Sequence, residues 1–482
     1  MVVGEISQER NLIIIGGGPG GYSAAIRAIQ LGLSVTLIEQ SDMGGVCLNE
    51  GCVPSKIYTH AAAKRSETAH LNDIGISTMD NSFDFHKLSA YKAKVINQLK
   101  AGIENLCNEN KIEIIRGKAT FLAVNKIGVE NGHQFDIFEF KQAIIATGSN
   151  PQLPAEMREK GNRILLPHEL FQLEEVPVHL IVRGQDYIAL EAASSFAALG
   201  AKVSVVKDCD VNYLFDDSIN KELDRLFKKR KMKVYKEKKF ISTKETEDGI
   251  YLTFLTDKDE EETIQGSHLF VSGTRKPDLE TLGISRFGIE QTSDGFIKID
   301  GNMQTSISSI FAIGDVAEGP MLAVKAIKQG KAAAAFIAGQ QVEVDFTFMP
   351  VVAHTIPPVV SVGLSEQKAR DFGMEIRTSK FALGSNGYAT ITGKRDGFIK
   401  IISDANTEVI QGIHMVGDGA AEMSGSFVQL LEMAAKEEDV KFPNYIHPGI
   451  NEGLLEAVEG LIGQAIHSAP NLESHKYKIK HR

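Results

Sequence analysis

The stretch "LIIIGGGPGGYSAAIRAIQLGLSVTLIEQ", residues 12–40, decides the fold of this chain. An apolar run ends in the glycine pattern Gly16-x-Gly18-x-x-Gly21, a helix of small and apolar residues follows, and a second apolar run ends at Glu39. Such glycines permit a tight turn between strand and helix, and the free N–H groups at the helix N-terminus attract a pyrophosphate. An acid about 20 residues further on accepts hydrogen bonds from ribose hydroxyls. The stretch therefore predicts a strand–helix–strand unit that binds a dinucleotide.

The same arrangement recurs at "VHLIVRGQDYIALEAASSFAALGAKVSVVK", residues 178–207. Its turn reads Gly184-x-Asp186-x-x-Ala189, so the middle glycine is replaced by an acid. Lys207 occupies the place at the end of the second strand where an acid would be expected. The repeat predicts two Rossmann-like domains, of which the second has an altered nucleotide turn.

The pattern changes again from about residue 347, where alternating strands such as "HTIPPVVSVGL" and "GFIKIISD" precede several helices. We therefore expect an α/β protein with two Rossmann-like domains and a C-terminal α+β domain. The predicted limits are 1–150 together with 277–346 for the first domain, 151–276 for the second and 347–482 for the third.

The composition argues against several classes of partner. The 482 residues carry a net charge of −10, whereas nucleic acid requires a basic surface. No run of about 18 uncharged apolar residues is present, and "MVVGEISQERN" lacks the regions of a secretion signal. The four cysteines are too few for a secreted disulfide framework; they are Cys47, Cys52, Cys107 and Cys209. We expect a cytoplasmic protein with no membrane or nucleic-acid partner.

The strongest chemical signal is "GGVCLNEGCVPSK", residues 44–56. Cys47 and Cys52 lie close together directly after the first nucleotide unit. A structural zinc site is the rival interpretation, but it needs four ligands, and the other two cysteines are isolated. On a helix that begins near Cys52, Lys56 falls one turn later, where its ammonium favours a thiolate. The stretch indicates redox chemistry and no metal.

With these motifs the chain resembles the pyridine nucleotide–disulfide oxidoreductases, and within them the dihydrolipoamide dehydrogenase branch. The resemblance also rests on "ATG" at 146–148, "AIGD" at 312–315 and "HPGINE" at 447–452. It implies bound FAD, a homodimer in which the third domain forms the interface, and a redox-active disulfide between Cys47 and Cys52. In the family's terms, Cys47 exchanges with the substrate dithiol and Cys52 faces the flavin.

The resemblance also assigns FAD-binding residues. These lie at the first glycine turn, at the end of the strand after it, in the cysteine stretch and at five later places in the chain: Gly16, Gly18, Pro19, Gly20, Gly21, Glu39, Gly45, Lys56, Gly117, Ala146, Thr147, Gly148, Arg275, Gly314, Asp315, Met321, Leu322 and Ala323. Glu191 matches the acidic partner of Lys56 in relatives.

His447 and Glu452 form the second catalytic element that the resemblance implies. A dithiol must lose a proton before it attacks a disulfide, and an imidazole oriented by a carboxylate can accept that proton. In relatives this pair completes the active site of the other subunit. Gly449 and Asn451 replace the usual Thr and Ser of the family, which puts the shape of the substrate pocket in doubt.

The altered second nucleotide site leaves the use of a nicotinamide cofactor open. Its residues are Gly184, Asp186, Ala189, Lys207 and Gly273. Asp186 brings a negative charge to the place where the backbone should approach a pyrophosphate, and Lys207 would suit a 2′-phosphate. Three alternatives remain: weak NAD binding, loss of nicotinamide binding, and a preference for NADP.

The function expected from these motifs is FAD-dependent oxidation of dihydrolipoamide, free or on a lipoyl-bearing protein, with electrons passing to NAD if the altered site binds it. One alternative keeps the dithiol chemistry and uses another acceptor, such as a quinone or a partner protein. The others are an NADP-dependent disulfide reductase and a non-catalytic docking subunit of a lipoyl-bearing complex.

Overall fold

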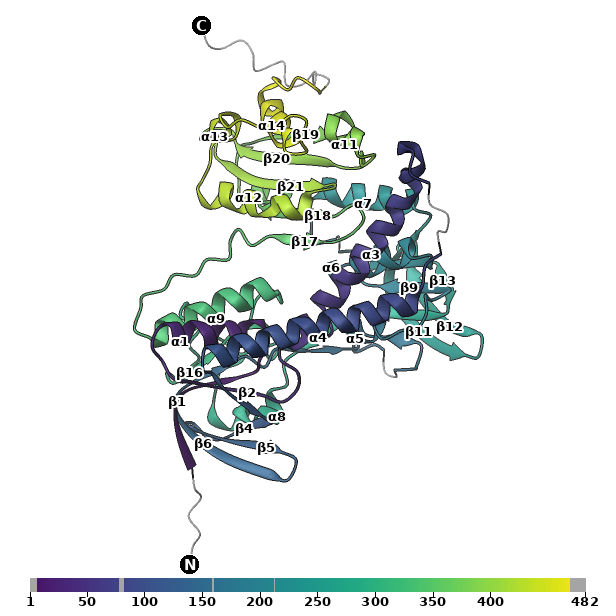
Figure 1. Ribbon diagram of the computed structural model, residues 1–482. Coiled ribbons are helices and arrows are strands. Elements are labelled where there is room, and N and C mark those ends of the chain that lie inside the picture. The colour runs from purple at the N-terminus through teal and green to yellow at the C-terminus, as the bar shows by residue number, and fades with distance from the viewer. Residues whose placement is uncertain (1–6, 78–81, 158–159, 212, 469–482) are drawn as a thin grey trace, which may run out of the picture.

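The structure, a computed structural model, describes residues 7–77, 82–157, 160–211 and 213–468, and contains three large sheets, each with its own core (Figure 1). The first sheet has the order β3-β2-β1-β6-β5-β4, with β16 beside β6. Its strands are β1 (Ser7–Ile15), β2 (Val35–Glu39), β3 (Glu113–Arg116), β4 (Lys118–Ala123), β5 (Lys126–Asn131), β6 (Gln134–Ile145) and β16 (Ile310–Ala312). The central strands are parallel, because α1 (Pro19–Gln30) and α4 (Phe85–Glu109) connect them.

The second sheet repeats this plan in the order β13-β12-β11-β10-β9-β14-β8. Its strands are β8 (Ile164–Leu165), β9 (His179–Arg183), β10 (Lys202–Asp208), β11 (Lys233–Thr246), β12 (Gly249–Thr256), β13 (Glu261–Gly266) and β14 (His268–Val271). The crossover helices are α6 (Tyr187–Ala198) and α7 (Asp217–Lys229), and the short α5 (Pro167–Leu170) follows β8. The prediction of two Rossmann-like domains is confirmed.

The chain passes between these two domains through a small antiparallel pair, β7 (Asn150–Gln152) and β15 (Thr274–Lys276). The pair lies where the predicted domain limits fall. After it come α8 (Leu279–Leu282), β16 and α9 (Ala323–Ile337), and α9 packs beside α1 in the first domain (Figure 1).

The third sheet is antiparallel throughout, in the order β17-β18-β21-β20-β19. Its elements are β17 (Val351–Ala353), β18 (Val359–Gly363), β19 (Ile376–Ala382), β20 (Phe398–Asp404), β21 (Ile410–Val416), α10 (Glu366–Asp371), α11 (Gly387–Ile391), α12 (Ala420–Glu432), α13 (Glu437–Lys441) and α14 (Glu452–Glu459). This is the α+β domain expected from the alternating strands. Within the described ranges, no helix combines the length and apolar character needed to span a bilayer.

Strand register makes the two nucleotide units directly comparable. The N–H of Gly16 donates to the carbonyl of Ile38 at 2.8 Å, and the N–H of Gly184 donates to the carbonyl of Val206 at 3.0 Å. The turn therefore starts at the same structural position in both domains. The residue that follows the Ile38 carbonyl is Glu39, which ends β2, and the residue that follows the Val206 carbonyl is Lys207, one residue before the end of β10.

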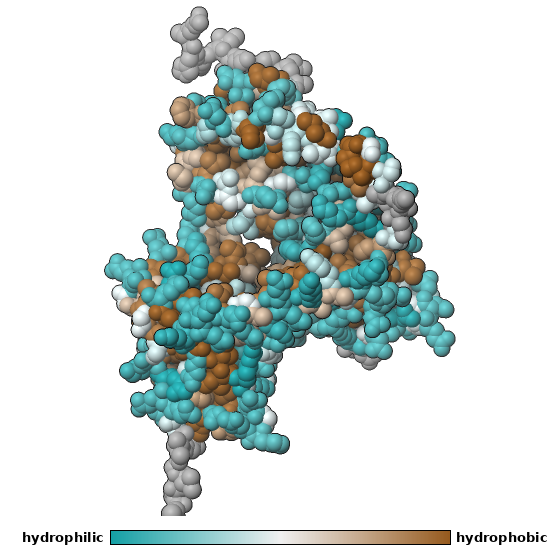
Figure 2. Space-filling model, viewed as in Figure 1, coloured by the Kyte–Doolittle hydropathy of each residue, from teal (hydrophilic) through white to brown (hydrophobic). Residues whose placement is uncertain are grey.

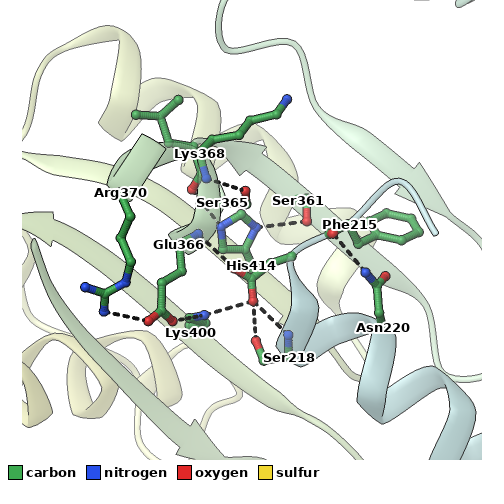
Figure 3. A network of polar contacts seen from close by, with 12 residues as sticks. Phe215, Ser218, Asn220, Ser361, Ser365, Glu366, Lys368, Arg370, Lys400 and His414 are labelled. Carbon is green, nitrogen blue, oxygen red and sulfur yellow. Dashed lines mark hydrogen bonds and ion pairs between the residues drawn. The ribbon is translucent and has the colours of Figure 1, made fainter. Parts of the chain in front are cut away.

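The third domain is joined to the second by a buried polar network (Figure 3). The ammonium of Lys400 on β20 lies 2.8 Å from the carboxylate of Asp216, which caps α7, and 2.7 Å from that of Glu366. Asp216 is 2% exposed and Lys400 6%. Burial alone would raise the pKa of Asp216, but hydrogen bonds from Lys400 and Ser218 hold it well below the usual range. The network therefore fixes a charged pair at the domain boundary.

Candidate active site

The cysteine stretch packs directly on the first glycine turn. It forms α2 (Gly45–Asn49) and the start of α3 (Cys52–Leu71). A β-carbon on Gly45 would lie 2.8 Å from Cα of Gly18, so only glycine permits this approach. The two cysteines are thus held beside the predicted dinucleotide site.

Cys47 and Cys52 are both free thiols in the structure, and the Cys47 side chain donates a hydrogen bond to Cys52. This bond outweighs the opposing effect of burial and, together with the nearby ammonium of Lys56, lowers the pKa of Cys52 to about 7. The same hydrogen bond and burial raise the pKa of Cys47. In the dithiol form, Cys52 is therefore the sulfur that ionises first.

Glu191 holds Lys56 in place from the neighbouring domain. Its carboxylate is 3% exposed and accepts hydrogen bonds from Lys56 Nζ at 2.8 and 2.9 Å. It also accepts from the hydroxyl of Ser55 and from the backbone N–H of His354 at 2.9 Å. The Lys56–Glu191 pair was expected, whereas the His354 contact was not, because it joins the third domain to the site and has no local sequence signal.

Packing between α3 and α6 supports this pair. Tyr58 is fully buried and stacks on Phe196 with ring centroids 5.8 Å apart, and it also meets Phe85 and Phe171 edge-on or tilted. Aromatic contacts of this kind add to simple burial. They fix the helix that begins at Cys52 against the helix that carries Glu191.

The first glycine turn fits a pyrophosphate. A β-carbon on Gly21 would lie 1.8 Å from the Gly16 carbonyl oxygen, and one on Gly16 would lie 2.3 Å from that of Ala146, so the protein's own packing requires both glycines. Gly18 is different, because its β-carbon would meet nothing nearer than 3.8 Å. Gly18 also precedes α1 without any side-chain cap. The helix N-terminus is therefore open, and its N–H groups are available to an anion.

The acid at the end of β2 is buried and well oriented. Glu39 is 7% exposed, and its carboxylate accepts from the N–H of Gly17 at 2.6 Å and of Ser41 at 2.7 Å. The N–H of Gly117 donates to its backbone carbonyl at 3.0 Å. These contacts hold the carboxylate beside the glycine turn, where a ribose would follow a pyrophosphate.

Three later loops also converge on this side of the first domain. The Ser149 hydroxyl donates to Asp315 at 3.2 Å and accepts from Arg275 at 3.0 Å. Tyr187 donates to the carbonyl of Met321 at 3.4 Å. Gly148, with a φ of +70°, has open space where a β-carbon would be. The remaining predicted positions, Thr147, Gly314, Leu322 and Ala323, belong to the same loops or to the start of α9.

His447 and Glu452 form the expected pair. The imidazole Nδ1 lies 2.8 Å from one carboxylate oxygen, and the N–H of Gly449 donates to the other at 2.8 Å. Burial would raise the pKa of Glu452, but His447 and the Gly449 N–H lower it overall. The His447 side chain is 81% exposed. It precedes α14 in the upper domain, far from α1 in Figure 1, so a single chain does not bring it to the cysteines.

Figure 2 shows this face of the molecule hollowed between the first and third domains, with apolar side chains beside the hollow.

A second imidazole, which the sequence analysis did not identify, lies near the His447–Glu452 pair. His467 Nδ1 is 2.6 Å from Glu456, one turn after Glu452 on α14, and this hydrogen bond raises the pKa of His467. The spacing of Glu452 and Glu456 on one helix face was the signal that could have revealed it.

The second nucleotide turn is occupied by its own side chain. Asp186 caps α6, and its carboxylate accepts from the N–H of Ala189 at 2.8 Å. Burial is the larger influence and raises the pKa of Asp186, although the Ala189 N–H and Ser272 hydrogen bonds oppose it. Gly184 and Gly273 keep the positive φ angles, +150° and +68°, that such turns use.

The expectation that Lys207 would suit a 2′-phosphate is wrong. Lys207 is 5% exposed, and its ammonium lies 3.3 Å from both carboxylate oxygens of Asp224. It also lies 4.1 Å from the ring centroid of Tyr213. Because the ammonium is buried beneath the ring and already paired, it presents no free cation to a ligand.

Comparison with known proteins identifies the family. Residues 10–330 match the pyridine nucleotide-disulphide oxidoreductase family model, and residues 349–458 match the model of that family's dimerisation domain. The chain is 37% identical to a dihydrolipoyl dehydrogenase of Geobacillus stearothermophilus, over 97% of this chain and 99% of that protein. It is 36% identical to one from Staphylococcus aureus, with 97% and 100% covered.

Solved structures show the same fold. LpdA from Mycobacterium tuberculosis superposes with a TM-score of 0.86 at 24% identity, covering 94% of this chain and 99% of that one. The HOCl-induced flavoprotein disulfide reductase RclA from Escherichia coli gives 0.83 at 22% identity, covering 93% and 99%. The chain thus belongs to the pyridine nucleotide–disulfide oxidoreductase family, as a flavin-dependent disulfide oxidoreductase of the dihydrolipoyl dehydrogenase type.

Proposed function

We propose that this chain oxidises dihydrolipoamide, free or carried on a lipoyl-bearing protein, as a cytoplasmic homodimer. The observation that carries the proposal is the dithiol pair, in which Cys47 and Lys56 lower the pKa of Cys52 to about 7. A thiol of this acidity is a good leaving group from a disulfide near neutral pH. The dihydrolipoyl dehydrogenase relatives support the same substrate class.

FAD would be held by the open α1 N-terminus at its pyrophosphate and by Glu39 at its ribose. Lys56 and Asp315 would lie toward its ring system, as their places beside the cysteines and the Ser149 loop suggest. When bound, the flavin supplies a two-electron acceptor next to the dithiol. The uncapped turn at Gly18 and the buried carboxylate of Glu39 fit this group.

The dithiol reaction starts with loss of one substrate proton to His447 of the partner subunit. The substrate thiolate attacks Cys47 Sγ of the oxidised pair, the Cys47–Cys52 bond breaks, and Cys52 leaves as a thiolate. The second substrate sulfur then attacks the first, which forms the cyclic disulfide and releases Cys47. Two electrons pass from the substrate to the cysteine pair, one proton ends on Cys47, and the other leaves through the imidazole.

Lys56 and Glu452 assist without exchanging sulfur. The Lys56 ammonium stabilises the Cys52 thiolate, and Glu191 keeps that ammonium in position. Glu452 accepts from His447 Nδ1, which leaves Nε2 to receive the substrate proton and stabilises the imidazolium that forms. This division of roles needs two subunits, because one chain separates the two groups of residues.

The test is an anaerobic titration of the purified FAD-loaded protein with dihydrolipoamide, followed by absorbance. We expect a two-electron-reduced form with a long-wavelength thiolate–flavin band. The C52S variant should lose the band, whereas C107S, which alters a buried thiol outside the site, should keep it. A wild-type protein that shows no band with excess dithiol would contradict the proposal.

A further inference from the structure

The second nucleotide unit does not fit a nicotinamide dinucleotide, although the family implies one. Because the strand registers of the two units agree, Asp186 stands where Gly18 stands in the first turn. In the first turn the helix N-terminus has no side-chain cap, whereas in the second a carboxylate already fills that position. The chain thus places the Asp186 carboxylate where the pyrophosphate of a bound nucleotide would lie.

The bond from Ala189 to Asp186 shows how the position is filled. The Ala189 N–H belongs to the first turn of α6, which is where a pyrophosphate would find its donors. A carboxylate in this place accepts the hydrogen bond of that N–H group, and its negative charge is stabilised by the positive end of the helix dipole. A ligand would have to displace the carboxylate and then remain beside it.

Charge adds to this competition. Two like charges about 4 Å apart weaken binding by about fivefold in water and by several hundred-fold at an intermediate dielectric. The turn lies partly buried between β9 and α6, so its dielectric is lower than that of water. The side chain therefore excludes a pyrophosphate by occupancy and by repulsion together.

The ribose end of the unit lacks the acid that Glu39 supplies in the first unit. Lys207, which occupies the position of Glu39, is paired with Asp224 beneath Tyr213. The Gln185 side chain accepts from the N–H of Asp208 at 2.9 Å. Position 207 therefore offers neither a carboxylate for ribose hydroxyls nor a free cation for a 2′-phosphate. Asp208, the last residue of β10, is exposed, and one of its carboxylate oxygens accepts from the N–H of Asp210 at 2.8 Å.

We propose that Asp186 closes the second nucleotide unit of this chain to NAD(H) and NADP(H), as an internal substitute for the pyrophosphate. The proposal concerns the same enzyme as the proposed dithiol reaction, but it rests on a separate site. The unit then remains as a structural domain whose helix α6 supports the dithiol site through Glu191.

The test is direct binding of NADH and of NADPH to the FAD-loaded homodimer by titration calorimetry. We expect no saturation of the wild type up to about 1 mM, and at least about tenfold tighter NADH binding in D186G. D186N should improve binding less, since an amide still caps the helix without the charge. D210N removes an exposed acid from the same domain and should change nothing.

Saturation of the wild type by micromolar NADH or NADPH would overturn the proposal, and so would equal affinities in the wild type and D186G. The dihydrolipoamide titration distinguishes this result from failure of the proposed function. All of these variants should still be reduced by the dithiol, because Asp186 does not contact either cysteine.

Discussion

The two glycine turns of this protein share one backbone plan and differ in what fills it. In the first, Gly18 leaves the N-terminus of α1 uncapped, and a buried Glu39 ends the second strand. In the second, Asp186 caps α6, and a buried lysine, Lys207, stands at the position of Glu39. Because the fold is the same, the comparison predicts that a few side chains at the turn, and not the Rossmann-like architecture, decide which ligand binds.

Helix α6 shows how such a loss can be local. Its N-terminus has an internal carboxylate in place of a ligand, yet Glu191, just over one turn later, binds Lys56 of the dithiol site. The nucleotide side and the dithiol side of one helix are therefore separable. Substitutions at the two turns and at the dithiol site can therefore test the two sides independently.

The largest effect is expected when the second turn is copied into the first. G18D should place a carboxylate at the N-terminus of α1, and FAD binding should fall at least about hundredfold because occupancy and repulsion act together. The measurement is flavin absorbance per mole of purified protein. G18A is the matched variant, because its β-carbon meets no protein atom nearer than 3.8 Å and therefore measures the steric share of the loss without a charge. Full flavin content in G18D would refute the comparison between the turns.

The next effect concerns the structural role left to the second domain. K400M should lower the free energy of unfolding by about 3 kcal/mol, because it leaves the buried Asp216 carboxylate without its cation, whereas the partly exposed Glu366 keeps Arg370 at 2.8 Å. Urea unfolding measures the change. K380M, whose ammonium lies over the Phe398 ring on the same sheet, serves as the control. A loss no greater than that of K380M would show that the network does not hold the domains together.

A smaller effect separates the dithiol side from the nucleotide side. The Cys47 hydrogen bond and the Lys56 ammonium together lower the pKa of Cys52 to about 7. K56M removes the smaller of these two influences, so this pKa should rise by about one unit. The thiolate–flavin band of the reduced enzyme should then titrate at higher pH. K64M, on the exposed face of the same helix, should leave the titration unchanged. An unshifted titration in K56M would remove Lys56 from the site.

The smallest effect is a dependence of stability on pH that arises in the third domain. His414 is 1% exposed, bonded to Ser361 and the Leu364 carbonyl, and burial lowers its pKa to about 4. In the unfolded chain the pKa of this imidazole is about 6.5. The unfolded state therefore binds the proton first, and stability should fall by about 1 kcal/mol between pH 7 and pH 5.5. In H414Q the urea midpoint should depend less on pH, and an unchanged dependence would contradict this.

Much of the fold was predictable because its signals are local. Apolar runs that end in glycine turns predicted both Rossmann-like domains, and the change to alternating strands predicted the third. Lys56 was placed correctly from helical spacing. The positions of Ser55 and Glu191 around it needed the resemblance or the structure, because their contact spans more than a hundred residues.

The sequence by itself brought two close cysteines and a lysine one turn later together by spacing, and its resemblance to the family implied the redox disulfide and the His447–Glu452 pair. Only the tertiary structure decided what the altered turn does. Spacing could not tell whether Asp186 points to a ligand or caps its own helix, nor that Tyr213 and Asp224 bury the Lys207 ammonium. These outcomes depend on which groups meet across the fold, and hydrogen-bond partners far apart in sequence leave no periodic signal.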